Sequence, residues 1–379
     1  MQLRNSRVIL VSLIVLVCCT SVQVFASSTR SAGFVYVMTN DPMGNKVIQF
    51  SRSSSGSLTK LSQASTGGVG GTGNGVGALD PLGSEDSLAL ASSGSVVLAV
   101  NAGSGTLSAL AVTSAGLQLL GTAVSSGGAF PNSVAANGNL VYVLNAHSTP
   151  PNISGFRLGS GGLTAISDST VTLPGFTASS SNVGADSPHD IRFSPDGTRL
   201  IVTEGAGSNL IDVFQLNDNG LVTGVSSTTS AGLNPFGMRF ARGGVLLNAE
   251  ADTNSVSSYS LSDDTLTVIS PAVVNGQAAT CWISVSGDGK FAFTSNTGAG
   301  NLSSHQVSRN GTLNLEQLIA ATAQGGNPID SAFSTDSAFL YVEDSSLGRV
   351  LIYRVNGASL SFIGVVTGFP TTVQGIAAQ

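Results

Sequence analysis

The chain has 379 residues and a formal net charge of −6 at pH 7, with only 9% charged residues and 47 Gly. Low charge with abundant Gly excludes a disordered chain and favours an all-β protein whose small side chains lie on tightly packed sheets. Because the chain is acidic and poor in Lys, it also argues against nucleic acid or an anionic membrane as a partner.

The first 26 residues predict a secretory signal peptide. Arg4 and Arg7 precede an apolar run over residues 8–17, and Val24-Phe25-Ala26 offers a small-residue cleavage site. The run is shorter than the roughly 20 residues that a bilayer span needs, so a retained anchor is the weaker alternative. We expect a mature protein that is extracellular or periplasmic and has no membrane span.

Cleavage at this site changes the charge and the cysteine content. The 15 basic residues become 13 against 21 acidic ones, which gives a net charge of −8. Cys18 and Cys19 are also lost, so Cys281 stays alone and cannot form an internal disulfide. A secreted protein without disulfides needs a large core for its stability, and a closed ring of sheets can supply one.

A short hydrophobic strand that ends in Asn or an acid recurs seven times along the chain. The strand endings are Asn40, Asn101, Asn145, Glu204, Glu250, Asn296 and Asp344. Successive gaps of 61, 44, 59, 46, 46 and 48 residues indicate a period near 45, which is typical of blade-type repeats. Asn at this position can bond the backbone where the strand turns. The three acids suggest either a local need for charge or a solvated loop.

The repeat that begins at Ser187 shows how one unit is built. Alternating residues predict its first strand over 189–193, followed by a Ser-Pro-Asp-Gly turn. Further strands are predicted over 200–204 and 210–216, and a fourth begins at Leu221. Four antiparallel strands make one blade, so residues 27–379 are predicted to form a single seven-bladed β-propeller.

The two ends of the chain complement each other. The first repeat starts directly at its second strand, residues 34–40, and the chain finishes with a segment over 372–376 that resembles a lone first strand. One C-terminal strand beside three N-terminal strands would complete a shared blade and close the ring. Closure leaves few exposed edges, which a β protein otherwise has to protect.

Two stretches are longer than the period allows. Residues 67–79 are rich in Gly, and residues 167–186 are rich in Ser and Thr. Composition alone indicates flexible surface loops, and the alternative is a lid over one mouth of the ring. A phosphate-binding loop is poorly supported, because no Lys follows the Gly-rich stretch.

The strands Phe-Val-Tyr-Val-Met-Thr-Asn over 34–40 and Leu-Val-Tyr-Val-Leu-Asn over 140–145 resemble the repeats of the seven-bladed lactonase propeller family. That family includes the bacterial propeller-type 6-phosphogluconolactonases and the fungal carboxymuconate-lactonizing enzymes. The segment Pro-His-x-Ile-x-Phe-Ser-Pro-Asp-Gly over 188–197 is the most specific part of the resemblance. It implies hydrolysis or reversible closure of a lactone ring, without a cofactor, on a small lactone or a carbohydrate-derived ligand.

The resemblance also implies catalytic residues at one mouth of the channel. The family's proposed site has a His just after the opening of one innermost strand, an Arg at the matching place in the next repeat, and a Glu at the end of that repeat's second strand. By position these are His189, Phe236 in place of the Arg, and Glu250. Arg239 lies three residues further along the same strand. Because side chains alternate between the two faces of a strand, the sequence leaves open which face Arg239 occupies. A His can transfer the proton that ring opening requires.

Further residues are predicted to surround the substrate. The positions one place after each opening form a mixed ring that consists of Asn132, His189, Phe236, Cys281, Ile329 and Gln374. The predicted substrate-binding residues include two of the acidic strand endings. They are Asn132, Glu204, Phe236, Arg239, Asp330 and Asp344. Because the family Arg is missing, a phosphorylated or tricarboxylate substrate loses its anchor, and we expect a less anionic lactone.

Other kinds of site have little support in the sequence. The three His residues are scattered without the spacing of metal ligands, so no metal site is expected. Cys281 has no evident His partner and is interpreted as a buried thiol. The alternative function is a non-catalytic extracellular or cell-surface binding or adhesion propeller, since a fold alone does not guarantee activity. We expect a monomer in either case.

Overall fold

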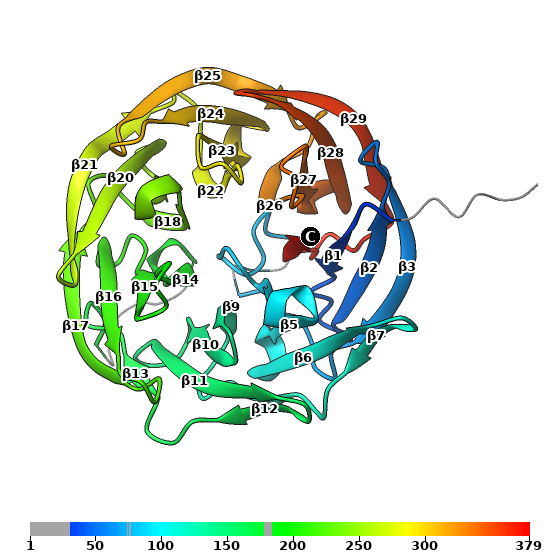
Figure 1. The fold of residues 1–379 in the computed structure, drawn as a ribbon, viewed down its shortest axis with the longest axis vertical. Coiled ribbons are helices and arrows are strands. Elements are labelled where there is room, and N and C mark those ends of the chain that lie inside the picture. Colours follow the sequence, from blue (N-terminus) through cyan, green and yellow to red (C-terminus); the bar gives the residue numbers. More distant parts are fainter. Residues whose placement is uncertain (1–30, 74, 76, 178–183) are drawn as a thin grey trace, which may run out of the picture. The chain divides into compact units, whose positions relative to one another are not determined.

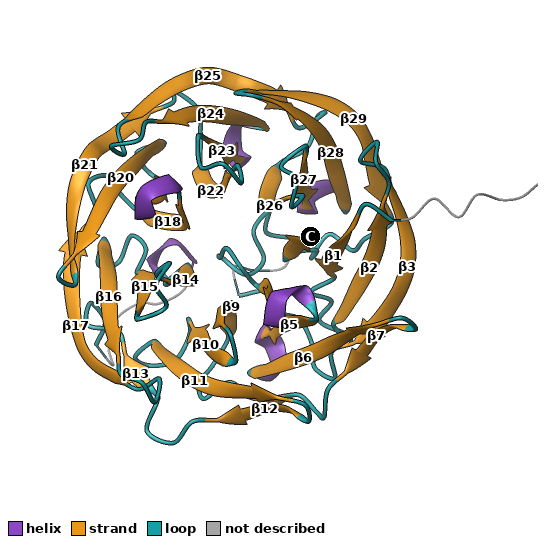
Figure 2. Ribbon diagram, in the orientation of Figure 1, coloured by secondary structure: helices purple, strands orange, loops and turns teal. Residues whose placement is uncertain are grey.

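Seven antiparallel sheets surround a central channel in the computed structural model (Figures 1 and 2). The structure describes residues 31–73, 75, 77–177 and 184–379, and Ser31–Gln379 form one unit. The predicted signal peptide, residues 1–26, lies outside the described residues. Each sheet runs outward from the channel and is one blade. The all-β, seven-bladed propeller predicted from the repeats is therefore confirmed.

The strands of each blade are given from the channel outward. Blade 1 contains β30 (Ile376–Ala378), β1 (Gly33–Met38), β2 (Lys46–Arg52) and β3 (Leu58–Ser65). Blade 2 contains β4 (Leu88–Ala91), β5 (Val96–Asn101), β6 (Thr106–Thr113) and β7 (Gly116–Leu119), with β8 (Val124–Ser125) also paired to β6. Blade 3 contains β9 (Pro131–Asn137), β10 (Leu140–Asn145), β11 (Asn152–Gly159) and β12 (Gly162–Ala165), with β13 (Val171–Thr172) also paired to β11.

The remaining four blades follow the same order. Blade 4 contains β14 (Asp190–Phe193), β15 (Arg199–Thr203), β16 (Leu210–Leu216) and β17 (Val222–Thr229). Blade 5 contains β18 (Pro235–Phe240), β19 (Leu246–Glu250), β20 (Ser255–Ser262) and β21 (Thr265–Val274). Blade 6 contains β22 (Thr280–Val285), β23 (Phe291–Asn296), β24 (Asn301–Val307) and β25 (Leu313–Thr322). Blade 7 contains β26 (Pro328–Phe333), β27 (Phe339–Asp344), β28 (Arg349–Asn356) and β29 (Ser359–Thr367).

The helical content of the described chain is limited to single turns. These 3₁₀ turns are η1 (Ser92–Gly94), η2 (Ala102–Ser104), η3 (Gly184–Asp186), η4 (Arg242–Gly244), η5 (Thr297–Ala299) and η6 (Ser345–Leu347). Five of them connect the strands of a blade, and η3 precedes β14. They therefore contribute to the two mouths of the channel and not to the blade faces.

The ring closes between the two ends of the chain. Strand β30 pairs antiparallel with β1, so that Ile376 lies opposite Val37 and Ala378 lies opposite Val35. In Figure 1 the red C-terminal strand lies beside the dark-blue β1. The predicted closure by a C-terminal strand is confirmed. It joins residues that are more than 300 positions apart, so the fold needs the whole repeat array.

The core lies between neighbouring blades. Strands β5, β10 and β27 are buried at every position, because the adjacent blades cover both of their faces. The Tyr142 hydroxyl donates to the Gly220 carbonyl at 2.6 Å, and the Tyr341 hydroxyl donates to the Gly56 carbonyl at 3.0 Å. Each of these bonds reaches a turn of the next blade. Burial of one such large side chain contributes about 1.5–3 kcal/mol.

The seven repeated strand endings hold each blade to the segment that enters it. Asn145 donates to the Ser126 carbonyl at 3.0 Å, Glu250 accepts from the Gly232 amide at 2.9 Å, and Asp344 accepts from the Asn327 amide at 3.1 Å. The same role is played by Asn40 with Thr372, Asn101 with Thr66, Glu204 with Gly175 and Asn296 with Asn275. These contacts join blades at the end where the inner strands begin.

Candidate functional site

A segment between blades 1 and 2 lies across the mouth at which the inner strands begin. We call residues 79–87 the cap; residues 81–85 within it are buried. Figure 1 shows this light-blue segment in the centre of the ring. The Leu82 amide donates to Gln374 at 2.8 Å, the Ser84 hydroxyl donates to the Asn132 carbonyl at 2.7 Å, and the Trp282 indole donates to the Ser84 carbonyl at 2.8 Å. The cap is therefore bonded to blades on several sides of the channel.

His189 lies directly under the cap. Its Nδ1 is 2.6 Å from the carbonyl oxygen of Gly83, and its Nε2 is 3.2 Å from Oδ1 of Asn234. The imidazole stacks on Phe236 with 4.1 Å between ring centroids, and Phe236 makes an edge contact with Trp282 at 4.9 Å. His189 is only 2% exposed. The structure thus brings two predicted site residues, His189 and Phe236, into contact at the mouth.

Glu250 lies in the joint between blades 4 and 5. Its side chain is fully buried and accepts from the Gly232 amide at 2.9 Å and from the Ser255 hydroxyl at 2.5 Å. An added Cβ at Gly232 would lie 2.3 Å from Oε2 of Glu250, so the glycine makes room for the carboxylate. Between described residues, no hydrogen bond or ion pair connects Glu250 with His189.

The remaining predicted residues divide between the mouth and the joints. Asn132 donates to the Pro188 carbonyl at 2.8 Å, next to His189, and is fully buried. Glu204 accepts from the Ser208 hydroxyl at 2.5 Å, and Asp344 forms a 2.7 Å ion pair with Arg349. Asn132 therefore lies beside the cap, whereas Glu204 and Asp344 hold blades together.

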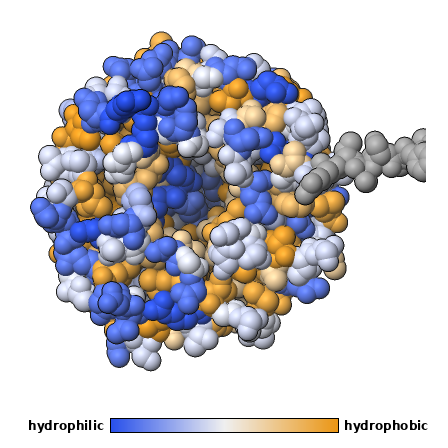
Figure 3. Space-filling model, in the orientation of Figure 1, coloured by the Kyte–Doolittle hydropathy of each residue, from blue (hydrophilic) through white to orange (hydrophobic). Residues whose placement is uncertain are grey.

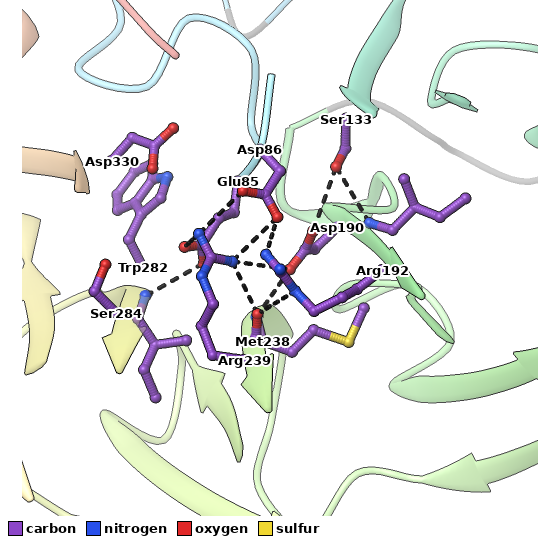
Figure 4. Close-up of polar contacts among 12 residues, drawn as sticks. Glu85, Asp86, Ser133, Asp190, Arg192, Met238, Arg239, Trp282, Ser284 and Asp330 are labelled. Carbon is purple, nitrogen blue, oxygen red and sulfur yellow. Dashed lines mark hydrogen bonds and ion pairs between the residues drawn. The ribbon is translucent and has the colours of Figure 1, made fainter. Parts of the chain in front are cut away.

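Arg239 points into the channel and meets two acids of the cap (Figure 4). Its Nη2 lies 2.6 Å from Oε1 of Glu85 and 3.0 Å from Oδ1 of Asp86. Arg192 of blade 4 also pairs with Asp86. The inner strand of blade 5 has a register shift between Pro235 and Met238, which is a β-bulge. Such a bulge interrupts the alternation of side chains and so re-aims Arg239.

Three more carboxyl groups surround this cluster. Asp190 accepts from the Met238 amide at 2.9 Å and lies 3.9 Å from Nη1 of Arg239. Asp330, a predicted site residue, is 1% exposed, and Glu343 is fully buried and accepts from the Gly375 amide at 2.8 Å. Five carboxyl groups thus accompany two guanidinium groups. Burying all of them as ions would cost too much, so some must hold a proton.

Burial is the main cause of the pKa shifts in the cluster. It raises the pKa of Glu85 to about 7 against the opposing field of Arg239. It raises the pKa of Asp190 to about 8, assisted by the nearby Glu85 charge, and that of Glu343 to about 8. The pKa of Asp330 also rises well above its usual range, through burial and then the neighbouring Glu343. Carboxyl groups that titrate near neutral pH are suited to acid-base chemistry.

The other end of the channel holds an open pocket of about 630 Å³. All seven inner strands contribute to its wall, and its charged groups are those of Asp86, Arg192, Arg239, Arg242 and Asp288. Figure 3 shows a hollow with hydrophilic residues at the centre of the face that it draws. His189 does not line this pocket. The cap thus separates two chemical environments along one channel: a covered mouth with His189 and an open pocket with three Arg side chains.

The comparison with protein families decides which group this propeller belongs to. The sequence model of the family Lactonase, 7-bladed beta-propeller matches residues 76–359. The chain belongs to this family. The resemblance seen in the repeat sequences is thereby confirmed. No curated protein sequence matches this lactonase-family propeller.

Solved structures similar to this lactonase-family propeller share its fold at low sequence identity. A 6-phosphogluconolactonase candidate from Bacteroides fragilis has a TM-score of 0.72 and 20% identity, over 93% of this chain and 99% of that chain. A protein from Lactobacillus plantarum has a TM-score of 0.72 and 21% identity, over 92% and 98%. The periplasmic gluconolactonase of Pseudomonas aeruginosa has a TM-score of 0.69 and 17% identity, over 90% and 98%.

The described residues of this lactonase-family propeller contain no helix long and apolar enough to cross a membrane. In the same part of the chain, no group of three or more His, Cys, Asp or Glu side chains could hold a metal ion. Cys281 is a buried free thiol, and burial raises its pKa well above the usual range.

Sequence reasoning did not find Glu85, Asp86, Arg192 and Glu343. The two cap acids follow a stretch whose composition suggested a surface loop, and their partner Arg239 is more than 150 residues away. A usable signal was nevertheless present. Glu85 and Asp86 are adjacent acids that stand just before an inner strand, and in a propeller that place faces the channel.

Proposed function

We propose that this propeller hydrolyses, or reversibly closes, a lactone ring at the mouth that carries His189. Membership of the lactonase propeller family supports this chemistry. The observation that carries the proposal is the 2.6 Å contact between His189 Nδ1 and the carbonyl oxygen of Gly83. An imidazole N–H that donates to a carbonyl oxygen at the channel mouth is placed as a general acid would be toward an ester oxygen.

His189 is proposed to transfer the proton during ring opening. Water adds to the carbonyl carbon of the lactone, the bond between that carbon and the ring oxygen breaks, and a carboxylate and a hydroxyl group result. The imidazole accepts the proton of the attacking water and returns it to the departing ring oxygen. Phe236 and Trp282 offer an apolar wall beside the imidazole.

Arg239 is the proposed replacement for the cation that the family carries where this chain has Phe236. In the capped state its guanidinium is occupied by Glu85 and Asp86. Withdrawal of the cap would uncover His189 and release Arg239 from Glu85 in the same movement. A guanidinium near the reacting ester stabilises the oxyanion that develops on the carbonyl oxygen.

Glu250 is proposed to act as a positioning residue. It holds the Gly232 amide, two residues before Asn234, and Asn234 lies against Nε2 of His189. The carboxylate therefore acts on the imidazole through the backbone of the blade joint. Loss of the hydrogen bond between Glu250 and the Gly232 amide would displace Asn234 from His189. It should lower kcat with little change in KM, because on this proposal the substrate does not contact Glu250.

The activity is tested on the mature chain with a panel of neutral and anionic γ- and δ-lactones, followed as acid release in a pH-stat. We expect hydrolysis of a weakly anionic lactone by the unaltered chain and uncatalysed rates for His189→Ala. Glu250→Gln is expected to lower kcat and keep KM. Equal rates for the unaltered chain and His189→Ala on every lactone would remove the catalytic role.

Non-catalytic binding is the second candidate, and the cap is the observation that favours it. Residues 81–85 are buried and bonded to several blades, so a cap that never withdraws would leave His189 unused. Such a propeller would serve outside the cell as a binding or adhesion module. Absence of hydrolysis even after the cap is loosened, for example by Gln374→Ala, would favour this candidate.

Export of the protein is proposed from residues 1–26, which have the pattern of a signal peptide. Full-length protein expressed with its own N-terminus should be recovered outside the cytoplasm and should begin at Ser27. N-terminal sequencing of the recovered protein checks this directly. A product that stays in the cytoplasm and retains Met1 would contradict the proposal.

A further inference from the structure

The open end of the channel is a second site on the other side of the cap from His189, and Arg239 is the residue that it shares with the proposed reaction. Its cavity of about 630 Å³ is lined by the later halves of the inner strands, whereas the cap bonds to the places where those strands begin. Asp86 is the one cap residue that lines the cavity. A ligand in this pocket would meet Arg192 and Arg239 without displacing the cap from His189.

We propose that this pocket binds a small hydroxy acid as its monocarboxylate, with Arg192 and Arg239 holding the carboxylate. The proposal does not depend on catalysis at His189. Both guanidinium groups reach the cavity, with side-chain exposures of 23% for Arg192 and 17% for Arg239. A guanidinium presents paired N–H donors that match the two oxygens of a carboxylate.

The donors of Arg192 leave room for such a ligand. Its Nε donates to the Met238 carbonyl at 2.9 Å, and its Nη2 pairs with Asp86. Within the described chain, Nη1 of Arg192 has no hydrogen-bond partner. It belongs to a side chain that lines the cavity. A half-buried guanidinium with a free donor group is well matched by an anionic acceptor.

The balance of charge selects a single negative charge. Asp86 pairs with both Arg192 and Arg239 and is 17% exposed, and Arg242 and Asp288 also line the cavity. Three cations against the carboxylates of Asp86 and Asp288 leave about one positive charge to be matched. Glu85, which lies 2.6 Å from Arg239 and has its pKa raised to about 7 by burial, offsets part of that charge. The raised pKa values of Asp190, near 8, and of Glu343, near 8, keep those groups largely neutral at pH 7. A phosphate dianion would exceed the available charge and be repelled by Asp86.

The walls of the pocket fit a compact ligand with hydroxyl groups. Small side chains such as Ala89, Ala136 and Ala332 line them beside larger apolar ones that include Phe193, Phe240 and Phe333. Polar groups stand among them, since the hydroxyls of Ser284 and Ser331 lie 2.8 Å apart on the wall. Ala side chains give space, and Ser hydroxyls can donate to or accept from the hydroxyls of the ligand. A hydroxy acid can use these Ser hydroxyls, which an apolar carboxylate cannot.

Calorimetric titration of the mature chain tests the proposal with D-gluconate as the probe. Sorbitol, which has the same number of carbons and no carboxylate, is the matched neutral ligand, and inorganic phosphate is the dianion. We expect gluconate to bind with one site per chain and sorbitol to bind at least about 10-fold more weakly, as the loss of charge-assisted hydrogen bonds implies. Equal binding of sorbitol, tighter binding of phosphate, or no binding of gluconate would overturn the proposal.

Variants locate the ligand in this pocket. Arg192→Gln should weaken gluconate binding at least about 10-fold, because it removes the charge-assisted hydrogen bonds. Arg192→Lys keeps the positive charge and loses the paired N–H donors of the guanidinium. Its affinity for gluconate should lie between those of the unaltered chain and Arg192→Gln, and it can be measured even if Arg192→Gln does not fold. Arg309→Gln removes an exposed positive charge elsewhere and should bind as the unaltered chain does. Unchanged affinity in both Arg192 variants would overturn the assignment.

The His189→Ala variant separates this inference from the proposed activity. It should lose lactone hydrolysis and keep its affinity for gluconate, because His189 does not line the pocket. Gluconate binding in a chain that hydrolyses no lactone would leave this inference standing while the proposed function fails. Loss of gluconate binding in His189→Ala would place the ligand at the capped mouth and contradict the inference.

Discussion

His189 and Gly83 form the contact that links the catalytic candidate to the cap. The 2.6 Å approach of Nδ1 to the Gly83 carbonyl oxygen joins residues that are 106 positions apart in the chain. In the proposed mechanism, this carbonyl group occupies the place at which an ester oxygen would receive a proton. On that proposal, the cap must withdraw before His189 can act.

Loosening the cap should expose the single Trp of the chain. Gln374→Ala removes a side chain that accepts from the Leu82 amide at 2.8 Å and donates to Asp80 at 2.7 Å and to the Ser84 carbonyl at 2.8 Å. Loss of these bonds should ease cap opening by about 2–3 kcal/mol. Trp282 is 1% exposed and donates to Ser84, so its fluorescence should shift to longer wavelength and be quenched more by acrylamide.

The control for this measurement is Gln118→Ala, because Gln118 is exposed on β7. It should leave the emission and the quenching of Trp282 unchanged. If Gln374→Ala lowered the midpoint of global unfolding without any change in Trp282, the cap would be an inseparable part of the core. The idea of a cap that withdraws would then be wrong.

Gly237→Ala should displace the side chain of Glu85 from its position beside Arg239. A Cβ added at Gly237 would lie 1.7 Å from Oε2 of Glu85 and 3.0 Å from the Cys281 carbonyl oxygen. Forcing a methyl group into this place should lower the free energy of unfolding by about 1–3 kcal/mol. Chemical denaturation of the purified variant measures the loss.

Gly364→Ala is the matched control for that substitution. Its nearest heavy atom, on Ile352, would lie 3.9 Å from the new Cβ. The free energy of unfolding should therefore change by no more than about 0.5 kcal/mol. Equal losses for Gly237→Ala and Gly364→Ala would show that the space beside Glu85 is not what constrains Gly237.

Stability should fall as the pH rises toward 9, because buried carboxyl groups lose their protons. Burial raises the pKa of Glu343 from 4.5 to about 8. The native state therefore binds more protons than the unfolded state between these values, and the stabilisation is lost as the pH rises through about 8. Glu343 alone should account for a loss on the order of 3–5 kcal/mol between about pH 4 and pH 9.

Glu343→Gln should flatten this dependence. The amide keeps an oxygen for the Gly375 amide and has no proton to lose. Thermal unfolding at about pH 5 and pH 9 should show a smaller difference than in the unaltered chain, with the remaining slope due to groups such as Asp190. Glu316→Gln, at an exposed site, is the control and should change nothing. An unaltered slope in Glu343→Gln would refute the assignment.

The fold could be predicted from the sequence because its signals are local and repeated. Strand β16 has the bounds that the sequence predicted, and β14, β15 and β17 differ by one residue at the ends compared. The strand endings recur because each side chain bonds to the segment that enters its blade: Asn145 donates to the Ser126 carbonyl, and Glu250 accepts from the Gly232 amide. Closure of the ring could also be predicted, because the first repeat lacks a first strand and the C-terminal segment supplies one.

The site could be predicted only in part. The position of His189 and the presence of Phe236 beside it follow from the alignment of the repeats, and the two rings do stack. The direction of Arg239 did not follow, because a bulge between Pro235 and Met238 interrupts the alternation of the strand. The partners of Glu85 lie in blades that only the closed ring brings together, so no local pattern could reveal them.

The most direct test compares lactone hydrolysis by Gln374→Ala and by the double variant Gln374→Ala/His189→Ala under identical conditions. If the cap restrains a His189 site, Gln374→Ala hydrolyses a lactone faster than the unaltered chain, and the double variant returns to the uncatalysed rate. Hydrolysis by the double variant at the rate of Gln374→Ala would contradict the account, since the reaction would then proceed without His189.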